Sequence, residues 1–339
     1  VTPETDWRSA NVTALQVGAG GTIFARKDAG ETKIFFAENV KWTSDGFEYI
    51  NNGSAGYIGL DGGTQTFAVA GSGSADAVAS FTTAMILDSN SRISLSNNDA
   101  GDLNTIFGHS AGASIHADAD QNTFIGHQVA DATMTATAND NTGVGYIALS
   151  ALTSGKENTA IGSYALFNNA STDYNTAVGV SAGQFTTGAN NTYVGSNAGK
   201  GASGAEASNV GVGKNALFAV TTGSSNVAIG KSAMVSVTTA GENVAIGESA
   251  LQSLLTGSAA NIAIGFYAMR NVDEGDGDGD ADYNIAIGYD ALKGGDFGSG
   301  NDGKDLKHNI AIGFQAMDAT NTDSQTGTIA IGKDSLGAL

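Results

Sequence analysis

A nine-residue phrase recurs through most of this chain and constrains its fold more than any other feature. One copy, residues 158–166, reads NTAIGSYAL, and two others, residues 226–234 and 261–269, read NVAIGKSAM and NIAIGFYAM. The glycine of the phrase occurs at 13 positions, mostly 16 to 19 residues apart: Gly108, Gly126, Gly145, Gly162, Gly179, Gly195, Gly213, Gly230, Gly247, Gly265, Gly288, Gly313 and Gly332. Self-similarity at a short fixed period is typical of a solenoid, in which each turn buries its apolar face only against neighbouring turns.

The composition excludes several other classes of protein. The 339 residues include 48 glycines but only one proline, Pro3, whereas a collagen triple helix needs glycine at every third residue and abundant proline. Apolar residues make up 41% of the chain and recur at regular positions, which argues against disorder. No cysteine is present, so no disulfide stabilises the fold.

The charge balance restricts the partners of the chain. Its 15 basic and 34 acidic residues give a formal net charge of −19, which disfavours nucleic acid because phosphates require basic patches. No apolar run approaches the roughly 20 residues of a membrane-spanning helix. We therefore expect neither nucleic-acid binding nor membrane insertion, and we attribute the acidic surface to solubility.

The chain divides by pattern into residues 1–100, which lack the phrase, and residues 101–339, which carry it. The first region predicts short strands near 14–18, 32–36, 67–69 and 92–96, separated by glycine and Asn/Asp/Ser clusters. We expect an irregular all-β base there. It is built either around its own small core or from interlaced strands of several chains.

Each copy of the phrase predicts one coil of a parallel β-roll. In residues 243–247, Val244 and Ile246 point to one face of a strand and Ala245 to the other. We expect the Val/Ile face to fill the interior. A glycine bend, a second short strand ending in Ala and Leu or Met, and a polar return loop complete the coil. The recurring asparagine either pairs with the same asparagine one coil away or serves only as a turn former.

The residue between the two larger side chains of each strand is small in most copies, and Tyr193 is an exception. If this stripe of alanines lies on the outside, it permits close approach of another backbone. We therefore expect it to form a flat packing face between identical rolls, although simple tolerance of alanine in a strand explains it as well.

The repeats resemble those of two families of fibrous protein. The phrase is similar to the Asn-Thr-Ala-Val/Ile-Gly-x-x-Ala-Leu repeats of phage tail fibre shafts, and residues 92–98 resemble sequences that precede such arrays. It is also similar to the Asn-Ser-Val-Ala-Ile-Gly repeats in the heads of trimeric autotransporter adhesins, whose coils are shorter. The resemblance covers roughly residues 104–339. It implies a homotrimer that attaches to a host cell or another surface.

The first of these families implies a virion location and specific partners. A tail fibre would contact other virion tail proteins through its N-terminal region and a host surface glycan or protein elsewhere. An adhesin would lie on a bacterial cell surface, but it would also carry a coiled-coil stalk and a membrane β-barrel. Neither pattern occurs in these residues, so we expect the phage relationship.

A polysaccharide-degrading tailspike is a third possibility, because such proteins place paired carboxylates on a long β-helix. Glu242 and Glu248 flank one copy, and Asp290 and Asp296 flank another. Most return loops are too short to build a cleft, and no nucleophile motif or phosphate loop is present. We therefore expect no enzymatic activity.

The spacing between glycines stretches to 23 and 25 residues around Gly288. Because a coil cannot lengthen without breaking its stack, we expect the extra residues to form lateral loops at about 267–283 and 290–308. Loops on a rigid scaffold commonly carry binding residues, although these two are explained equally by tolerated insertions. The candidate receptor-binding residues are Tyr283, Lys293, Phe297, Lys304 and Lys307.

Two features suggest metal binding. Aspartates alternating with glycine resemble a calcium loop, but a twelve-residue loop counted from Asp276 ends at Ile287 rather than glutamate. The stretch is either an incomplete calcium site or a solvated acidic loop. Its candidate ligands are Asp276, Asp278, Asp280 and Asp282.

His109 and His127 follow the glycines of adjacent copies, so we expect their side chains to stack one coil apart. Rings of these histidines around the axis of a trimer would suit a transition metal. Stacked surface histidines without a metal fit the pattern too.

Overall fold

The computed structural model describes residues 12–28, 31–43, 45–61, 63–87, 93–95, 103–201, 204–253, 257–272, 281–294, 305–318 and 324–337. The chain divides into two compact units, Val1–Asp99 and Ala100–Leu339. Within the described residues the secondary structure consists of strands and turns. No helix there is long and apolar enough to cross a membrane. The expected all-β class is confirmed.

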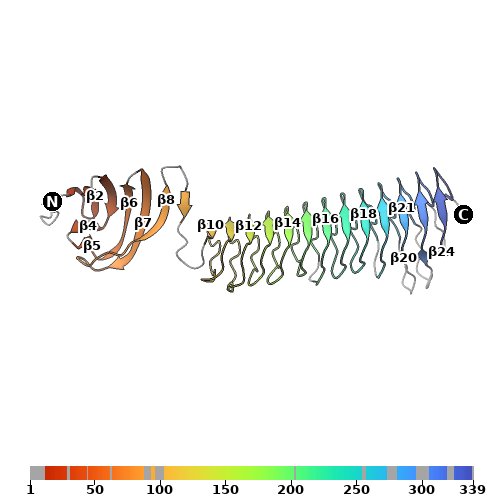
Figure 1. The fold of residues 1–339 in the computed structure, drawn as a ribbon, viewed down its shortest axis with the longest axis horizontal. Coiled ribbons are helices and arrows are strands. Elements are labelled where there is room, and N and C mark those ends of the chain that lie inside the picture. The colour runs from red at the N-terminus through yellow and green to blue at the C-terminus, as the bar shows by residue number, and fades with distance from the viewer. Residues whose placement is uncertain are drawn as a thin grey trace. The chain divides into compact units, whose positions relative to one another are not determined.

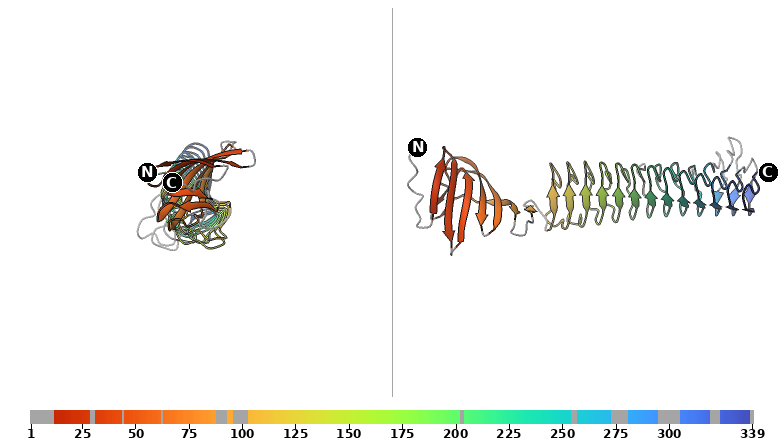
Figure 2. Two further views of the ribbon diagram at one scale, coloured as in Figure 1. Left: turned by 90° about the vertical axis from the view of Figure 1, so that its left-hand side faces the viewer. Right: turned by 90° about the horizontal axis from the view of Figure 1, so that it is seen from above.

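The N-terminal unit is built on a seven-stranded antiparallel sheet whose strands lie side by side in Figure 2. In spatial order these are β1 (Val12–Val17), β2 (Gly21–Asp28), β3 (Glu31–Glu38), β6 (Gly53–Asp61), β7 (Thr64–Gly73), β8 (Thr82–Leu87) and β9 (Ile93–Leu95). Between β3 and β6 the chain forms a separate hairpin, β4 (Val40–Thr43) and β5 (Gly46–Tyr49). The predicted strands near 14–18, 32–36, 67–69 and 92–96 all lie within or overlap strands of the sheet.

The hairpin covers one face of the sheet and encloses an aromatic core. Phe24 and Phe35 stack with ring centroids 4.9 Å apart, and Phe47 of the hairpin packs edge-on against both. Phe24 is 1% exposed and Val40 is completely buried. The base therefore has its own core within one chain, which agrees with the first of the two alternatives expected from the sequence.

The repeat array forms one 13-stranded parallel sheet, in which each copy supplies one three-residue strand (Figure 1). The strands are β10 (Thr105–Phe107), β11 (Thr123–Ile125), β12 (Thr142–Val144), β13 (Thr159–Ile161), β14 (Thr176–Val178), β15 (Thr192–Val194), β16 (Val210–Val212), β17 (Val227–Ile229), β18 (Val244–Ile246), β19 (Ile262–Ile264), β21 (Ile285–Ile287), β23 (Ile310–Ile312) and β25 (Ile329–Ile331). Equivalent residues pair in register, as Ala228 does with Ala245. At about 4.8 Å per coil, the array extends for about 60 Å. The predicted parallel β-roll with one copy per coil is confirmed.

The orientation of these strands is the reverse of the one expected. Ala245 is completely buried, whereas Val244 is only half-buried and Ile246 is 37% exposed. Side chains alternate along a strand, and here the middle one of the three points inward. The interior of the thin coil leaves little space for a larger side chain. A Cβ added to Gly143, for example, would lie 2.5 Å from the side chain of Val129. The alanine stripe therefore lines the interior and cannot be the packing face between copies.

The second segment of each coil is a run of turns, not the second short strand that we expected. In the copy that contains β13, Tyr164 and Leu166 have φ values of 59° and 47°, so the backbone repeatedly enters the left-handed region. Gly162, at φ 135°, makes the bend before it, and a Cβ there would collide with the carbonyl of Gly179 one coil away. Ala165 and Leu166 of this segment are completely buried and supply much of the bulk of the interior.

The recurring asparagines form a continuous buried ladder of hydrogen bonds. Asn226 donates its side-chain amide to Oδ1 of Asn209 at 3.1 Å and to the carbonyl of Ala240 at 2.9 Å. Asn243 in turn donates its backbone N–H and its side-chain amide to Oδ1 of Asn226. Of the two explanations offered by the sequence, pairing between coils is therefore confirmed. The ladder ends where Thr328 replaces asparagine and donates its backbone N–H to Asn309.

Candidate functional site

The coils with expanded spacing carry a small additional sheet next to the predicted lateral loops. It is parallel and consists of β20 (Ala281–Asp282), β22 (Leu306–Lys307) and β24 (Gln325–Thr326), two of which are labelled in Figure 1. Ala281 and Leu306 are buried in the roll. The extra residues of both expanded copies therefore return to the array through paired strands.

The structure brings two predicted receptor-binding residues to this sheet. Tyr283 follows β20 and stacks on His308, which follows β22, with ring centroids 5.2 Å apart and an interplanar angle of 16°. Tyr283 is 58% exposed. Lys307 precedes His308 and pairs with Asp305 at 3.1 Å. An exposed aromatic pair thus lies beside an ion pair at one position on the array.

Among the described residues, Lys293 is the one remaining candidate, and it belongs to a different ion pair. Lys293 lies after the second segment of its coil and pairs with Asp290 at 3.7 Å. Its backbone carbonyl accepts a hydrogen bond from Asn271 of the preceding copy. Phe297 and Lys304 lie outside the described residues.

The metal hypotheses stay predictions. Asp276, Asp278 and Asp280 lie outside the described residues, and Asp282 accepts a hydrogen bond from the backbone of Ala259 at 2.7 Å, so its carboxylate already stabilises the roll. In the described part of the chain, no group of three or more histidine or acidic side chains is placed to hold a metal ion.

The expected stacking of His109 on His127 is confirmed, with ring centroids 5.2 Å apart and an interplanar angle of 14°. Tyr146 and Tyr164 continue the aromatic row at centroid separations of 5.5 Å. Neighbouring rings thus contact one another through successive coils.

The structure shows no contact between Glu242 and Glu248, the described pair of carboxylates considered for catalysis. Glu248 forms an ion pair with Lys231 at 2.8 Å on the exposed surface. Glu242 occupies the left-handed turn before Asn243 and donates its backbone N–H to Ser224. Asp296 lies outside the described residues, so its relation to Asp290 stays a prediction.

A second aromatic row, which the sequence reasoning missed, follows the glycines of three successive late copies. The rings of Phe266 and Tyr289 are 5.5 Å apart, and those of Tyr289 and Phe314 are 5.1 Å apart, with interplanar angles of 8° and 10°. All three are between 38% and 45% exposed. Because equivalent residues stack from coil to coil, three aromatic residues at one repeat position were the signal for this row.

A titratable pair lies inside the roll. Glu206 and the ring of Tyr193 are completely buried, and neither carboxylate oxygen nor the phenol oxygen has a hydrogen-bond partner within the described residues. Burial raises the pKa of Glu206 to about 7. Burial also raises the pKa of Tyr193, and the charge of Glu206 adds to that increase. A neutral Glu206 is therefore the form that the interior favours.

Tyr193 is accommodated by two glycines that replace the usual leucine or methionine. A Cβ on Gly183 would lie 3.1 Å from the ring of Tyr193, and one on Gly199 would overlap the ring. One large residue in the strand is thus compensated by two missing side chains in the second segments of its own and the preceding coil.

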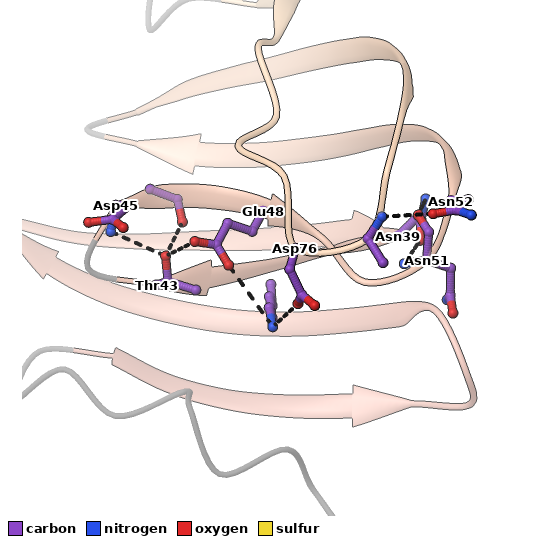
Figure 3. Close-up of polar contacts among 10 residues, drawn as sticks. Asn39, Thr43, Asp45, Glu48, Asn51, Asn52 and Asp76 are labelled. Carbon is purple, nitrogen blue, oxygen red and sulfur yellow. Dashed lines mark hydrogen bonds and ion pairs between the residues drawn. The ribbon is translucent and has the colours of Figure 1, made fainter.

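In the N-terminal unit, a polar network fixes the hairpin (Figure 3). Lys41 is only 6% exposed and pairs with Asp76 at 2.7 Å and with Glu48 at 4.0 Å. Thr43 lies within hydrogen-bond distance of Glu48, at 3.0 Å, and accepts a hydrogen bond from the backbone of Asp45 at 3.2 Å. The network connects the hairpin to the turn after β7, and we assign it a structural role.

Comparison of the chain with protein-family models, with curated proteins and with solved structures found no match.

Proposed function

We propose that this chain is a structural component of a viral tail fibre, that it acts as a homotrimer, and that it mediates attachment to the host cell surface. The observation that carries the proposal is the outer face of the 13-stranded sheet. Residues on this face are aliphatic in the later copies and remain partly exposed, as Ile229 at 39% and Ile287 at 37% illustrate. The repeat phrase and its resemblance to tail fibre shafts support the same function.

The size of this face favours coverage by another protein surface. A sheet about 60 Å long and about 10 Å wide presents on the order of 600 Å². This area is at the upper end of the roughly 300–600 Å² of the largest apolar patch on a typical monomer, and it would supply most of the roughly 800 Å² that each partner of a standard interface buries. Identical copies in parallel would present the same face along its whole length, since the register of the sheet does not change between β10 and β25. We therefore place this face, and no longer the alanine stripe, at the contact between copies.

The proposal gives each end of the chain a role. The N-terminal unit would bind other virion tail proteins. Its sheet has one open face with exposed apolar side chains, among them Phe36 and Val69. The lateral loops would meet a host surface glycan or protein near Tyr283 and Lys307. The proposed location is the virion tail, and calcium in the acidic stretch remains part of the hypothesis.

Immunogold electron microscopy tests the proposal against its main alternative, the head of a trimeric bacterial adhesin. Antibodies raised against the purified chain are applied to virus particles and bacteria from the same culture. We expect gold on the tail fibres of the particles. Gold confined to appendages of the bacterial surface would contradict the fibre and support the adhesin.

The recognition role of the lateral loops has a separate test. Deletion of residues 274–279 and 296–303 shortens both copies to the common glycine spacing of 17 residues and keeps Tyr283 and Lys307. We expect the shortened fibre to remain a trimer and to adsorb less to the host cells that the virus infects. Unchanged adsorption would show that the deleted loop residues do not contact the receptor. Release of oligosaccharides from host capsule by the intact fibre would instead support a degrading tailspike.

A further inference from the structure

A cavity of about 430 Å³ lies in the N-terminal unit, between the hairpin β4–β5 and the seven-stranded sheet. Phe35 and Tyr57 contribute to it from the sheet, and Trp42 and Phe47 contribute from the hairpin. Its volume falls in the range of about 300–1,000 Å³ that is typical of small-molecule sites. The cavity lies outside the repeat array and plays no part in the proposed contact between copies.

A glycine in the wall of the cavity allows two aromatic side chains to pack closely against the backbone. A Cβ on Gly59 would lie 3.1 Å from the ring of Phe35 and 3.2 Å from the ring of Tyr57. Any other residue would therefore push these rings apart or occupy the space between them. Gly59 is buried and its backbone is not in the left-handed region, so the close approach of the two rings is what requires glycine.

Three polar groups that line the cavity have no hydrogen-bond partner among the described residues. They are the hydroxyl of Tyr57, the indole N–H of Trp42 and the hydroxyl of Thr66. All three residues are only partly exposed. Burial raises the pKa of Tyr57, so its phenol remains a neutral hydrogen-bond donor. None of the three polar atoms is sealed from solvent, so each can exchange its water for a hydrogen bond to a ligand.

The charged groups of the cavity balance one another. Lys33 pairs with Asp61 at 2.5 Å, and the guanidinium of Arg26 lies 4.2 Å from the centre of the Trp42 ring. Asp45 supplies a second carboxylate, so two cations face two anions. A balanced set of donors and acceptors fits a neutral polyhydroxylated ligand better than a phosphate or a metal ion.

We infer that this cavity binds a pyranose sugar. A sugar ring presents an apolar C–H surface suited to the aromatic walls. Its rim of hydroxyl groups would satisfy Tyr57, Trp42 and Thr66 and contact the Lys33–Asp61 pair. The inference goes beyond the proposed function, because it assigns a ligand site to the unit expected to contact the virion. It holds for a fibre or an adhesin alike, so its failure would leave the fibre proposal untouched.

Tryptophan fluorescence of the full-length chain tests the inference. The chain has two tryptophans, Trp7 and Trp42, so the substitution Trp7→Phe leaves Trp42 as the only reporter. Glucose, galactose, mannose and N-acetylglucosamine, all neutral pyranoses, serve as probes in separate titrations. We expect a saturable change in Trp42 emission with at least one of them. The absence of a saturable change with all four would overturn the inference.

Variants then locate the binding of the responding sugar. Tyr57→Phe and Thr66→Val each remove one hydroxyl and keep the shape of the side chain, and each is expected to weaken binding about fivefold, as for the loss of one hydrogen bond. Tyr146→Phe and Thr82→Val make the same chemical changes away from the cavity and should leave the affinity unchanged. Gly59→Ala displaces the rings of Phe35 and Tyr57 that line the cavity and should also weaken binding, provided that circular dichroism shows an intact fold. Equal affinities of the cavity variants and their controls would contradict the site.

Discussion

Asn158 donates both its backbone N–H and its side-chain amide to the same oxygen, Oδ1 of Asn141, at 3.1 Å in each case. Its own Oδ1 accepts the backbone N–H of Asn175 at 2.9 Å. The side-chain amide also reaches the carbonyl of Thr172 at 2.9 Å. Each buried asparagine thus connects the coil before it to the coil after it, which explains why the residue recurs while the flanking strand positions vary.

The ladder predicts a large cost for removing one member. Asn158→Ala leaves the buried N–H of Asn175 and the carbonyl of Thr172 without these partners, and we expect a loss of about 2–4 kcal/mol in the free energy of unfolding. Asn168→Ala, on the partly exposed part of the same coil, is the matched control and should cost less than about 1 kcal/mol. Urea denaturation measures both. Similar losses for the two variants would argue against a structural role for the ladder.

The fit of Tyr193 against Gly199 predicts a strong coupling between the two positions. Tyr193→Ala opens a cavity and should cost about 3–5 kcal/mol. Gly199→Leu alone should also destabilise, since a side chain there overlaps the tyrosine ring. Other copies carry leucine at this position with similar backbone angles, as Leu217 does at φ 54°. The double variant should therefore be more stable than either single one in denaturation experiments, and strictly additive losses would refute the compensation.

Glu206 predicts a pH dependence of stability. Its folded-state pKa is raised from 4.5 to about 7, so its protonated form favours folding. Stability should be full below about pH 4.5 and fall as the pH rises through 7, by at most about 3 kcal/mol. Glu206→Gln should remove this dependence, whereas the exposed Glu157→Gln should retain it. Melting temperatures of the wild type and both variants, recorded between pH 5 and 8, test this prediction. The same dependence of melting temperature on pH in all three proteins would contradict a role for Glu206.

The periodicity alone was sufficient to predict the coils, their parallel stacking and their register. The prediction of which strand side chains face the interior was wrong, because we assumed that the larger side chains Val244 and Ile246 fill it. The second segment supplies that bulk instead, through residues such as Leu251, so only Ala245 fits opposite it. Short apolar strands do not reveal which face is buried when both faces are apolar and the thickness of the coil is unknown.

In the N-terminal unit the sequence indicated strands but not their pairing. The sheet joins β3 to β6 across the inserted hairpin, and no local pattern specifies such a connection. The cavity around Trp42 and Tyr57 was missed for the same reason, since its residues meet only through that pairing. His109 and His127 illustrate the opposite case, because equivalent positions in successive copies stack as a direct consequence of the repeat.

Native mass spectrometry of the full-length chain tests most directly the proposal that copies associate through the outer aliphatic face. The wild type should have three times the mass of the 33.9 kDa chain. The double variant Ile229→Asp/Ile246→Asp places two charges on this face and should dissociate to monomers, because isolated charges are costly to bury. Thr239→Asp, on an exposed part of the loop between those two positions, should remain a trimer. A monomeric wild type, or a trimer that survives both isoleucine substitutions, would contradict the account.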